Sequence, residues 1–429
     1  MSAKLFKEFR NALAVENSEE ISERYKAITT RLNKDYWDIE SDSTNCLQVG
    51  SYGRNTAING VRDLDMAFEL PWEVYDRFNK RTGNVQSQLL QEIRDCLKVR
   101  YPTTDIRADS QVVVLDFTNY RVEVLPAFKG EDGGYTFPDS NDDGSWKNCW
   151  PRDEMNAVTE VNNRANRNLK HVCKILRSWK NTHGAPMGGM LIDTLTYNFF
   201  RVNTTYDTKS YGSYPELMRD IFQYISDQPE QEYWLAPGSR DRVTSKGRFQ
   251  AKAEKALVWC QEAIDVDADK KKENIWRKTF GNVFPTTELA KKADTRYRNT
   301  EEFIENSFPV DIQFELAIDS EVMNQGQKEG HLRKLRAKFF WLPLGRRLRF
   351  YITSCNVPEP YIVYWKIKNV GAVAERLDKI RGQICPDEGN RTRSETADFD
   401  GPHFVDCYVI KDGICVARDR LDVPLGGDT

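Results

Sequence analysis

No stretch of the 429-residue chain approaches the roughly 20 consecutive apolar residues that a membrane-spanning helix needs, so we expect no membrane association. The opening sequence, MSAKLFKEFR, also lacks the apolar segment of a secretory leader. The nine cysteines stand singly, without a CxxC pair, which is typical of a reducing compartment. We therefore expect a cytoplasmic protein without disulfides.

Histidine and excess positive charge are also scarce. The four histidines lie far apart, and a zinc site would need His403 with Cys407 and Cys415, which we interpret instead as buried or half-buried side chains. A net charge of −3 and a pI near 6.0 argue against a surface built for duplex DNA, although one local basic groove would be compatible with them. The balance of 39% hydrophobic and 30% charged residues excludes bulk disorder.

The hydrophobic pattern predicts an α+β protein of several domains. Helical periodicity over 18–37 and 86–99 precedes two strand segments, 112–117 and 121–125. The short connection Thr118–Tyr120 between these strands predicts a hairpin. Helical patterns dominate 160–284, and period-two alternation takes over beyond about 310. We predict a catalytic half with a mixed sheet, a helical half of the same core, a linker and a β-rich, sandwich-like domain, over residues 1–160, 161–285, 286–309 and 310–429.

Residues 129–153 are rich in Gly, Asp, Asn and Ser, and this composition predicts a long loop. Aromatic side chains there or on the helices are possible stacking partners for a nucleobase. The residues considered are Tyr135, Phe137, Trp146, Tyr197 and Tyr211.

The most informative segment runs from Gly50 to Leu70. A Gly50-Ser51 turn precedes Asp63-Leu64-Asp65, after which apolar and polar residues alternate as on a strand. Positions i and i+2 share a face, so both aspartates point the same way. Adjacent carboxylates repel unless a cation bridges them, and Mg²⁺ prefers such oxygen ligands. Free backbone N–H groups at the glycines and the serine hydroxyl suit phosphate.

Two-metal phosphoryl transfer commonly needs a third carboxylate on a neighbouring strand. Glu123 lies between Val122 and Val124 in a segment too apolar for a casually exposed charge, and we favour it. Asp116, which ends the preceding strand, is the alternative.

These motifs resemble a known family. The segments GSYGRNTAI, DLDM and VEVLPAF, with the helix NLKHVCKILRSWK, are similar to the bacterial relatives of cyclic GMP-AMP synthase, the CD-NTases or SMODS nucleotidyltransferases. The resemblance covers about residues 15–285 and implies a polymerase β-like nucleotidyltransferase fold. The stretch from YWKIKNVG to HFVDCYVI resembles the C-terminal sensor domain, of the AGS-C type, that accompanies some of these enzymes.

The resemblance implies roles for particular residues. Asp63, Asp65 and Glu123 would be the catalytic residues and hold Mg²⁺, while Gly50 and Ser51 would cradle the donor triphosphate. A lysine on the helix around 170–180 would reach the same phosphates, and Lys174 and Lys180 are the candidates. Many relatives carry a phosphate-binding serine before the next helix, where this chain has Met187-Gly188-Gly189 instead, so backbone N–H groups would have to replace it.

The resemblance implies a Mg²⁺-dependent synthase that makes a cyclic di- or oligonucleotide second messenger from nucleoside triphosphates, ATP and GTP among them, and releases pyrophosphate. Further implied partners are a separate effector protein that responds to the product, in antiphage (CBASS-type) defence, and an activating RNA or phage ligand. Two alternatives stay open: a terminal nucleotidyltransferase acting on RNA or a small hydroxyl acceptor, and a catalytically inactive nucleotide or RNA sensor.

Overall fold

The computed structural model describes residues 2–15, 18–60, 63–287, 302, 304, 307–336, 342–369, 381–387, 389–397 and 401–424. The chain divides into two compact units, 1–292 and 293–429. Most of the predicted linker, 286–309, lies outside the described residues. None of the described helices is long and apolar enough to cross a membrane.

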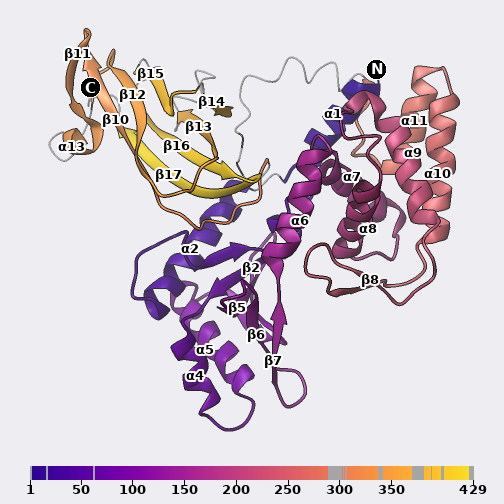
Figure 1. The fold of residues 1–429 in the computed structure, drawn as a ribbon, viewed down its shortest axis with the longest axis horizontal. Helices are drawn as coiled ribbons and strands as arrows, with labels where there is room; N and C mark the ends of the chain where they lie inside the picture. The colour runs from indigo at the N-terminus through magenta and orange to yellow at the C-terminus, as the bar shows by residue number, and fades with distance from the viewer. Residues whose placement is uncertain are drawn as a thin grey trace. The chain divides into compact units, whose positions relative to one another are not determined.

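A seven-stranded mixed sheet is the centre of the first unit (Figure 1). Its main order is β1-β2-β5-β4-β3, and β6 and β7 extend it from β5. The pair β2–β5 is parallel and β4–β5 is the expected hairpin. The strands are β1 (Cys46–Gln48), β2 (Asp63–Glu69), β3 (Asp105–Asp109), β4 (Val112–Asp116), β5 (Arg121–Lys129), β6 (Tyr135–Asp139) and β7 (Ser145–Cys149).

Apolar stripes on three helices cover one face of this sheet (Figure 1). These helices are α2 (Ser18–Tyr36), α4 (Trp72–Asn79) and α5 (Val85–Arg100). Helix α5 begins where the Asn84 side chain accepts a hydrogen bond from the Ser87 amide at 2.8 Å, a typical N-cap. The buried core includes Ile28 and Leu32 of α2 and Leu89 of α5.

The helical half has its own core. It contains α6 (Pro151–Arg164), α7 (Asn168–His183), α8 (Gly189–Val202), α9 (Tyr214–Ser226), α10 (Gln250–Asp265) and α11 (Asp269–Phe280), with a small hairpin of β8 (Tyr233–Leu235) and β9 (Arg242–Thr244). Phe6 and Phe9 of α1 (Ser2–Ala12) pack on Trp276, Phe280 and Phe284, so the first helix belongs to this core although it is distant in sequence.

The second unit is a β-sandwich. One sheet has the order β11-β10-β12-β15 and the other β14-β13-β16-β17. Side chains of both sheets, such as Val322 and Phe350 from one and Trp365 and Val405 from the other, share one core. The elements are β10 (Leu316–Asn324), β11 (Gln327–His331), α13 (Leu332–Arg336), β12 (Arg347–Cys355), β13 (Ile362–Asn369), β14 (Arg381–Pro386), β15 (Thr392–Thr396), β16 (Pro402–Lys411) and β17 (Ile414–Pro424).

The predicted α+β class, with a mixed sheet, a helical half and a β-rich C-terminal part, is confirmed. The loop prediction for 129–153 is wrong, because β6 and β7 form a hairpin there and α6 begins at Pro151. Glycine and aspartate mark its turns, whereas Tyr135 and Phe137 point into the core. These two rings are therefore part of the fold, and Trp146 donates its indole N–H to Asn79.

Candidate active site

The parallel pair β2–β5 brings the predicted carboxylates together. Asp63 lies opposite Arg121 and Asp65 lies opposite Glu123 in the register of these strands. Paired residues of adjacent strands share a face, so the three carboxylates and the Arg121 guanidinium occupy one patch. The register thus favours Glu123 as the third carboxylate.

The opposite face of both strands anchors this patch. Leu64 and Met66 on β2 and Val122 and Val124 on β5 are all buried in the core beneath α2 and α5. A slip by one residue would exchange the apolar and charged faces, so burial of these four side chains fixes the register. The strands therefore hold the carboxylates on a rigid support.

Asp116 lies in a different environment. It is opposite Arg121 on the other side of β5, and its carboxylate forms an ion pair with Arg107 of β3. Its charge is already compensated there. The structure therefore does not bring this alternative third carboxylate next to Asp65.

Burial and mutual repulsion perturb the carboxylates. Burial raises the pKa of Asp65 to about 6, with Glu123 and Asp63 contributing and Arg54 and Arg121 opposing. Burial also raises the pKa of Glu123, which Arg121 partly offsets. The Arg121 Nε lies 2.7 Å from Asp63 Oδ1 and 3.0 Å from Glu123 Oε1. One guanidinium thus partly balances three acids.

This donor set fits a hard divalent cation. A second positive charge would relieve the repulsion that raises the pKa of Asp65, and carboxylate oxygens are ligands that Mg²⁺ accepts. Within the described ranges, no three or more acidic, histidine or cysteine side chains are already arranged to coordinate a metal. For one cation to reach both Asp63 and Glu123, Arg121 would have to leave its position between them.

Gly50 and Ser51 begin the one-turn helix α3 (Gly50–Gly53), and this segment, called the turn below, lies directly against the patch. The backbone of Gly50 has φ +64°, and a Cβ there would stand 1.8 Å from Asp65 Oδ2. Only glycine combines this left-handed conformation with so close an approach. The Val49 amide also donates to the Asp65 carbonyl at 3.0 Å. The turn and the acidic patch are therefore one local structure.

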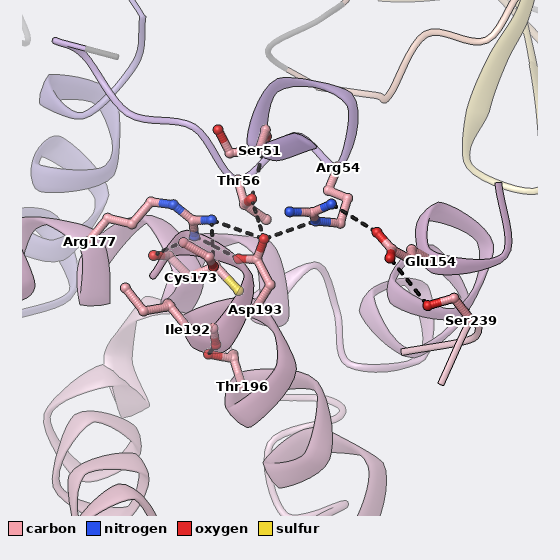
Figure 2. A network of polar contacts seen from close by, with 11 residues as sticks. Ser51, Arg54, Thr56, Glu154, Cys173, Arg177, Ile192, Asp193, Thr196 and Ser239 are labelled. Atoms are coloured by element: carbon pink, nitrogen blue, oxygen red, sulfur yellow. Dashed lines mark hydrogen bonds and ion pairs between the residues drawn. The ribbon is translucent and has the colours of Figure 1, made fainter. Parts of the chain in front are cut away.

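A buried ion-pair network secures the other end of the turn (Figure 2). Asp193 of α8 is fully buried and receives Arg54 Nε at 3.0 Å, Arg177 Nη1 at 2.6 Å and the Thr56 hydroxyl at 2.9 Å. Burial alone would raise the pKa of Asp193, but Arg177 and Arg54 lower it to about 2. Asp193 thus stays charged and joins the turn to α7 and α8.

The same network extends to α6. Arg54 Nη1 lies 3.1 Å from Glu154 Oε2, and Ser239 donates to Glu154 Oε1 at 3.2 Å (Figure 2). Sequence reasoning missed these residues. One available signal was a charged Asp193 within the apolar run MLIDTL, which indicates a buried ion pair rather than a solvated acid.

The two candidate lysines differ in position. Lys174 Nζ donates to Asn55 Oδ1 at 3.1 Å, so it contacts the end of the turn. Burial, with Arg10 and Arg177 nearby, lowers the pKa of Lys174 to about 7. Lys180 lies six residues further along α7, about 9 Å by helical rise, and no described contact joins its side chain to the turn.

One buried lysine was not predicted. Lys170, one helical turn before Lys174, donates to the Thr159 hydroxyl at 3.1 Å, and burial lowers its pKa to about 7. Two neighbouring ammonium groups therefore lie in the interior without a described carboxylate at hydrogen-bond distance.

The other residues considered in the sequence take part in packing or in helix capping. Tyr211 is stacked with His171 at a ring-centroid distance of 5.7 Å, and Tyr197 packs against the helical core. His403, Cys407 and Cys415 are buried in the sandwich. Gly188 caps the N-terminus of α8, and the Gly189 carbonyl accepts Arg177 Nη2 at 3.0 Å.

Comparison with known proteins agrees with this geometry. Residues 1–162 match the family described as the Second Messenger Oligonucleotide or Dinucleotide Synthetase domain, and residues 298–426 match the Adenylyl/Guanylyl and SMODS C-terminal sensor domain. Residues 1–162 thus belong to the CD-NTase family. The protein is a nucleotidyltransferase with a C-terminal sensor domain.

Two curated relatives are similar over more than half of this chain. A probable cyclic nucleotide synthase of Bacillus cereus (strain VD146) is 21% identical over 278 residues, 56% of this chain and 82% of the relative. A cyclic AMP-AMP-AMP synthase of an Acinetobacter strain is 23% identical over 257 residues, 57% of this chain and 74% of the relative.

Solved structures show the same fold. CdnC of Escherichia coli MS115-1, in a complex with a truncated HORMA protein, has a TM-score of 0.51 at 14% identity, and the match covers 67% of this chain and 99% of CdnC. The structure of CdnC with ATP gives a TM-score of 0.50 over the same shares. The expected nucleotidyltransferase fold is thereby confirmed.

Proposed function

We propose that this protein is a Mg²⁺-dependent nucleotide cyclase. It joins nucleoside triphosphates, ATP and GTP among them, into a cyclic di- or oligonucleotide second messenger and releases pyrophosphate. The observation that carries this proposal is the β2–β5 register, which sets Asp65 beside Glu123 on the face that Asp63 shares, directly against the Gly50 turn.

Each reaction step forms one phosphodiester bond. A ribose hydroxyl oxygen attacks the α-phosphorus of the donor in line, the bond from that phosphorus to the pyrophosphate oxygen breaks, and the hydroxyl proton leaves. When bound, Mg²⁺ would lower the pKa of the hydroxyl and neutralise charge on the pyrophosphate. Glu123, whose pKa burial raises, would accept the proton.

The surrounding residues would bind and orient the donor. Ser51 and the backbone of Gly50 would hold its triphosphate beside Asp65, and Lys174, already in contact with Asn55, would add positive charge. The Asp193 network would keep this turn in place during two successive transfers. Ring closure requires the linear intermediate to return to the same site in the opposite orientation.

The product would act as a signal. We propose that it activates a separate effector protein in antiphage defence of the CBASS type, and that an RNA or phage ligand activates the synthase. The named activities of the two curated relatives, both nucleotide synthases, support the synthesis of such a product.

The test is a product assay with all four labelled nucleoside triphosphates and Mg²⁺. It compares wild type with the double variant Asp63→Asn/Asp65→Asn. Asp142→Asn/Asp143→Asn is the matched control, because it also removes two negative charges but from an exposed turn. Products are treated with phosphatase and resolved by chromatography and mass spectrometry.

We expect a phosphatase-resistant product from wild type and the control, and none from the Asp63/Asp65 variant. Its mass gives the bases and the ring size. Phosphatase-sensitive ladders would indicate a terminal transferase instead. Nucleotide binding without turnover, even with added RNA or phage lysate, would indicate an inactive sensor.

A further inference from the structure

An open pocket lies in the helical half, formed by elements that carry none of the carboxylates, and we refer to it as the cavity. Its volume is about 540 Å³, within the range of small-molecule sites. The last turns of α8 contribute Asn198 and Arg201, while Gln231, the β8 strand and Arg240 complete the lining. The cavity is thus distinct from the proposed active site.

Two arginines without ion-pair partners line this cavity. Arg201 is exposed at the end of α8 and Arg240 lies in the turn after β8, and neither guanidinium pairs with an acid in the part of the chain that the structure describes. Glu232 is the one acidic residue of the lining, so the cavity carries a net positive charge. This charge favours an anionic ligand, since arginine binds phosphate through paired N–H groups.

The turn that carries Arg240 is held rigidly in a strained form. Arg240 has φ +64°, a conformation that L-residues other than asparagine and aspartate rarely adopt. A Cβ at neighbouring Gly238 would lie 2.2 Å from the Asp153 carbonyl oxygen, so the turn packs tightly on α6. Ser239 also bonds to Glu154 of the buried network (Figure 2). An arginine maintained in a strained backbone position indicates a role for its side chain.

Aromatic and amide groups complete the lining. Tyr233 is half-buried, and the Arg242 guanidinium lies over its ring at 4.4 Å from the centroid, which restrains the ring. The buried Trp234 donates its indole N–H to Gln228 at 3.1 Å and also lines the cavity. Asn198 and Gln231 offer both donors and acceptors. A planar heterocycle with polar edges matches these groups.

We propose that this cavity binds a free nucleotide, with its phosphate between Arg201 and Arg240 and its base beside Tyr233. The site is additional to the one that would turn over nucleoside triphosphates. The proposal does not depend on catalysis, because the test measures binding alone.

The experiment is equilibrium dialysis of radiolabelled AMP, GMP, CMP and UMP against the full chain in EDTA. Three variants locate the site: Arg201→Gln, Arg240→Gly and the active-site double variant Asp63→Asn/Asp65→Asn. Glycine tolerates φ +64°, so Arg240→Gly removes the guanidinium without disturbing the turn. Arg94→Ala, on the exposed side of α5, is the control for general charge loss.

We expect one mole of at least one monophosphate per mole of protein, and a loss of affinity of about 10-fold or more in each cavity variant. The active-site and Arg94 variants should bind as wild type does. Absence of saturable binding by wild type, or wild-type affinity in both cavity variants, would overturn the proposal. Equal affinity for inorganic phosphate would also overturn it, as would tighter binding of a single-stranded RNA 20-mer through the same arginines.

Discussion

Two aspartates of the first unit, the half-buried Asp65 and the fully buried Asp193, stand in opposite electrostatic environments. Asp65 faces two other carboxylates and its pKa rises to about 6, whereas Asp193 faces two arginines and its pKa falls to about 2. Both contact the same short segment: Gly50 lies on Asp65, and Arg54 and Thr56 bind Asp193.

The two environments suit two different roles, a structural one for Asp193 and a cation-binding one for the carboxylates of β2 and β5. Asp193 has enough positive charge within the protein, so its carboxylate is satisfied and fixes the turn. Of the carboxylates of β2 and β5, Asp63 and Glu123 share one guanidinium, that of Arg121, and all three lie at the sheet face against the turn. A shortage of compensating charge leaves them suited to an external cation.

We expect the largest effect on stability from removal of the Asp193 charge, which the buried arginines compensate. We expect Asp193→Asn to lower the free energy of unfolding at pH 7 by about 3–5 kcal/mol, because it leaves Arg177 buried without its carboxylate partner and leaves Arg54 with Glu154 alone. Asp95→Asn, which breaks an exposed pair with Arg94, should cost at most about 1 kcal/mol. Urea denaturation of both variants measures the difference, and equal losses would contradict this account.

The second prediction concerns the acidic patch of β2 and β5, where positive charge is scarcer. Glu123→Gln should lower the rate of product formation about 1,000-fold with little change in stability, since several kcal/mol of transition-state stabilisation depend on the metal site. Asp116→Asn, which alters the carboxylate paired with Arg107, should change the rate less than about 3-fold. Steady-state pyrophosphate release measures both rates. The reverse ranking would make Asp116 the third carboxylate.

The contact between the turn and Asp65 can be tested with two glycines. Gly50→Ala places a Cβ 1.8 Å from Asp65 Oδ2 and should reduce activity about 100-fold through displacement of the carboxylate. Gly60→Ala is the matched control, because Gly60 also has positive φ, +82°, but nothing lies within 4 Å of its added Cβ. An equal loss of activity in both variants would show that backbone strain at positive φ, and not the contact with Asp65, causes the effect.

The smallest effect should be an increase in the free energy of unfolding, whereas most substitutions decrease it. The folded-state pKa of Asp65, about 6, exceeds the ordinary 3.8, so its ionisation destabilises the fold as pH rises from about 4 to 6. Asp65→Asn should therefore raise the free energy of unfolding at pH 7 in EDTA by about 1–2 kcal/mol, while abolishing activity. Thermal unfolding at pH 4 should show no such gain. A destabilised variant at pH 7 would contradict the repulsion argument.

Much of the architecture could be predicted from local pattern. Period-two alternation located the strand with Asp63 and Asp65, and the short 118–120 connection predicted the β4–β5 hairpin. The 129–153 segment failed because its composition is dominated by turn residues, while the strands between them are only five residues long. The domain boundaries and the roles of the seven site residues stay predictions.

The sequence by itself determined which side chains can do chemistry, because strand periodicity puts Asp63 and Asp65 on one face whatever the rest of the chain does. Only the tertiary structure decided which partners they meet. The parallel register that sets Glu123 beside Asp65, and the meeting of Arg54 with Asp193 across 139 positions, depend on burial of apolar faces distant in sequence. Local propensity carries no information about such contacts, since they form only when those faces pack together.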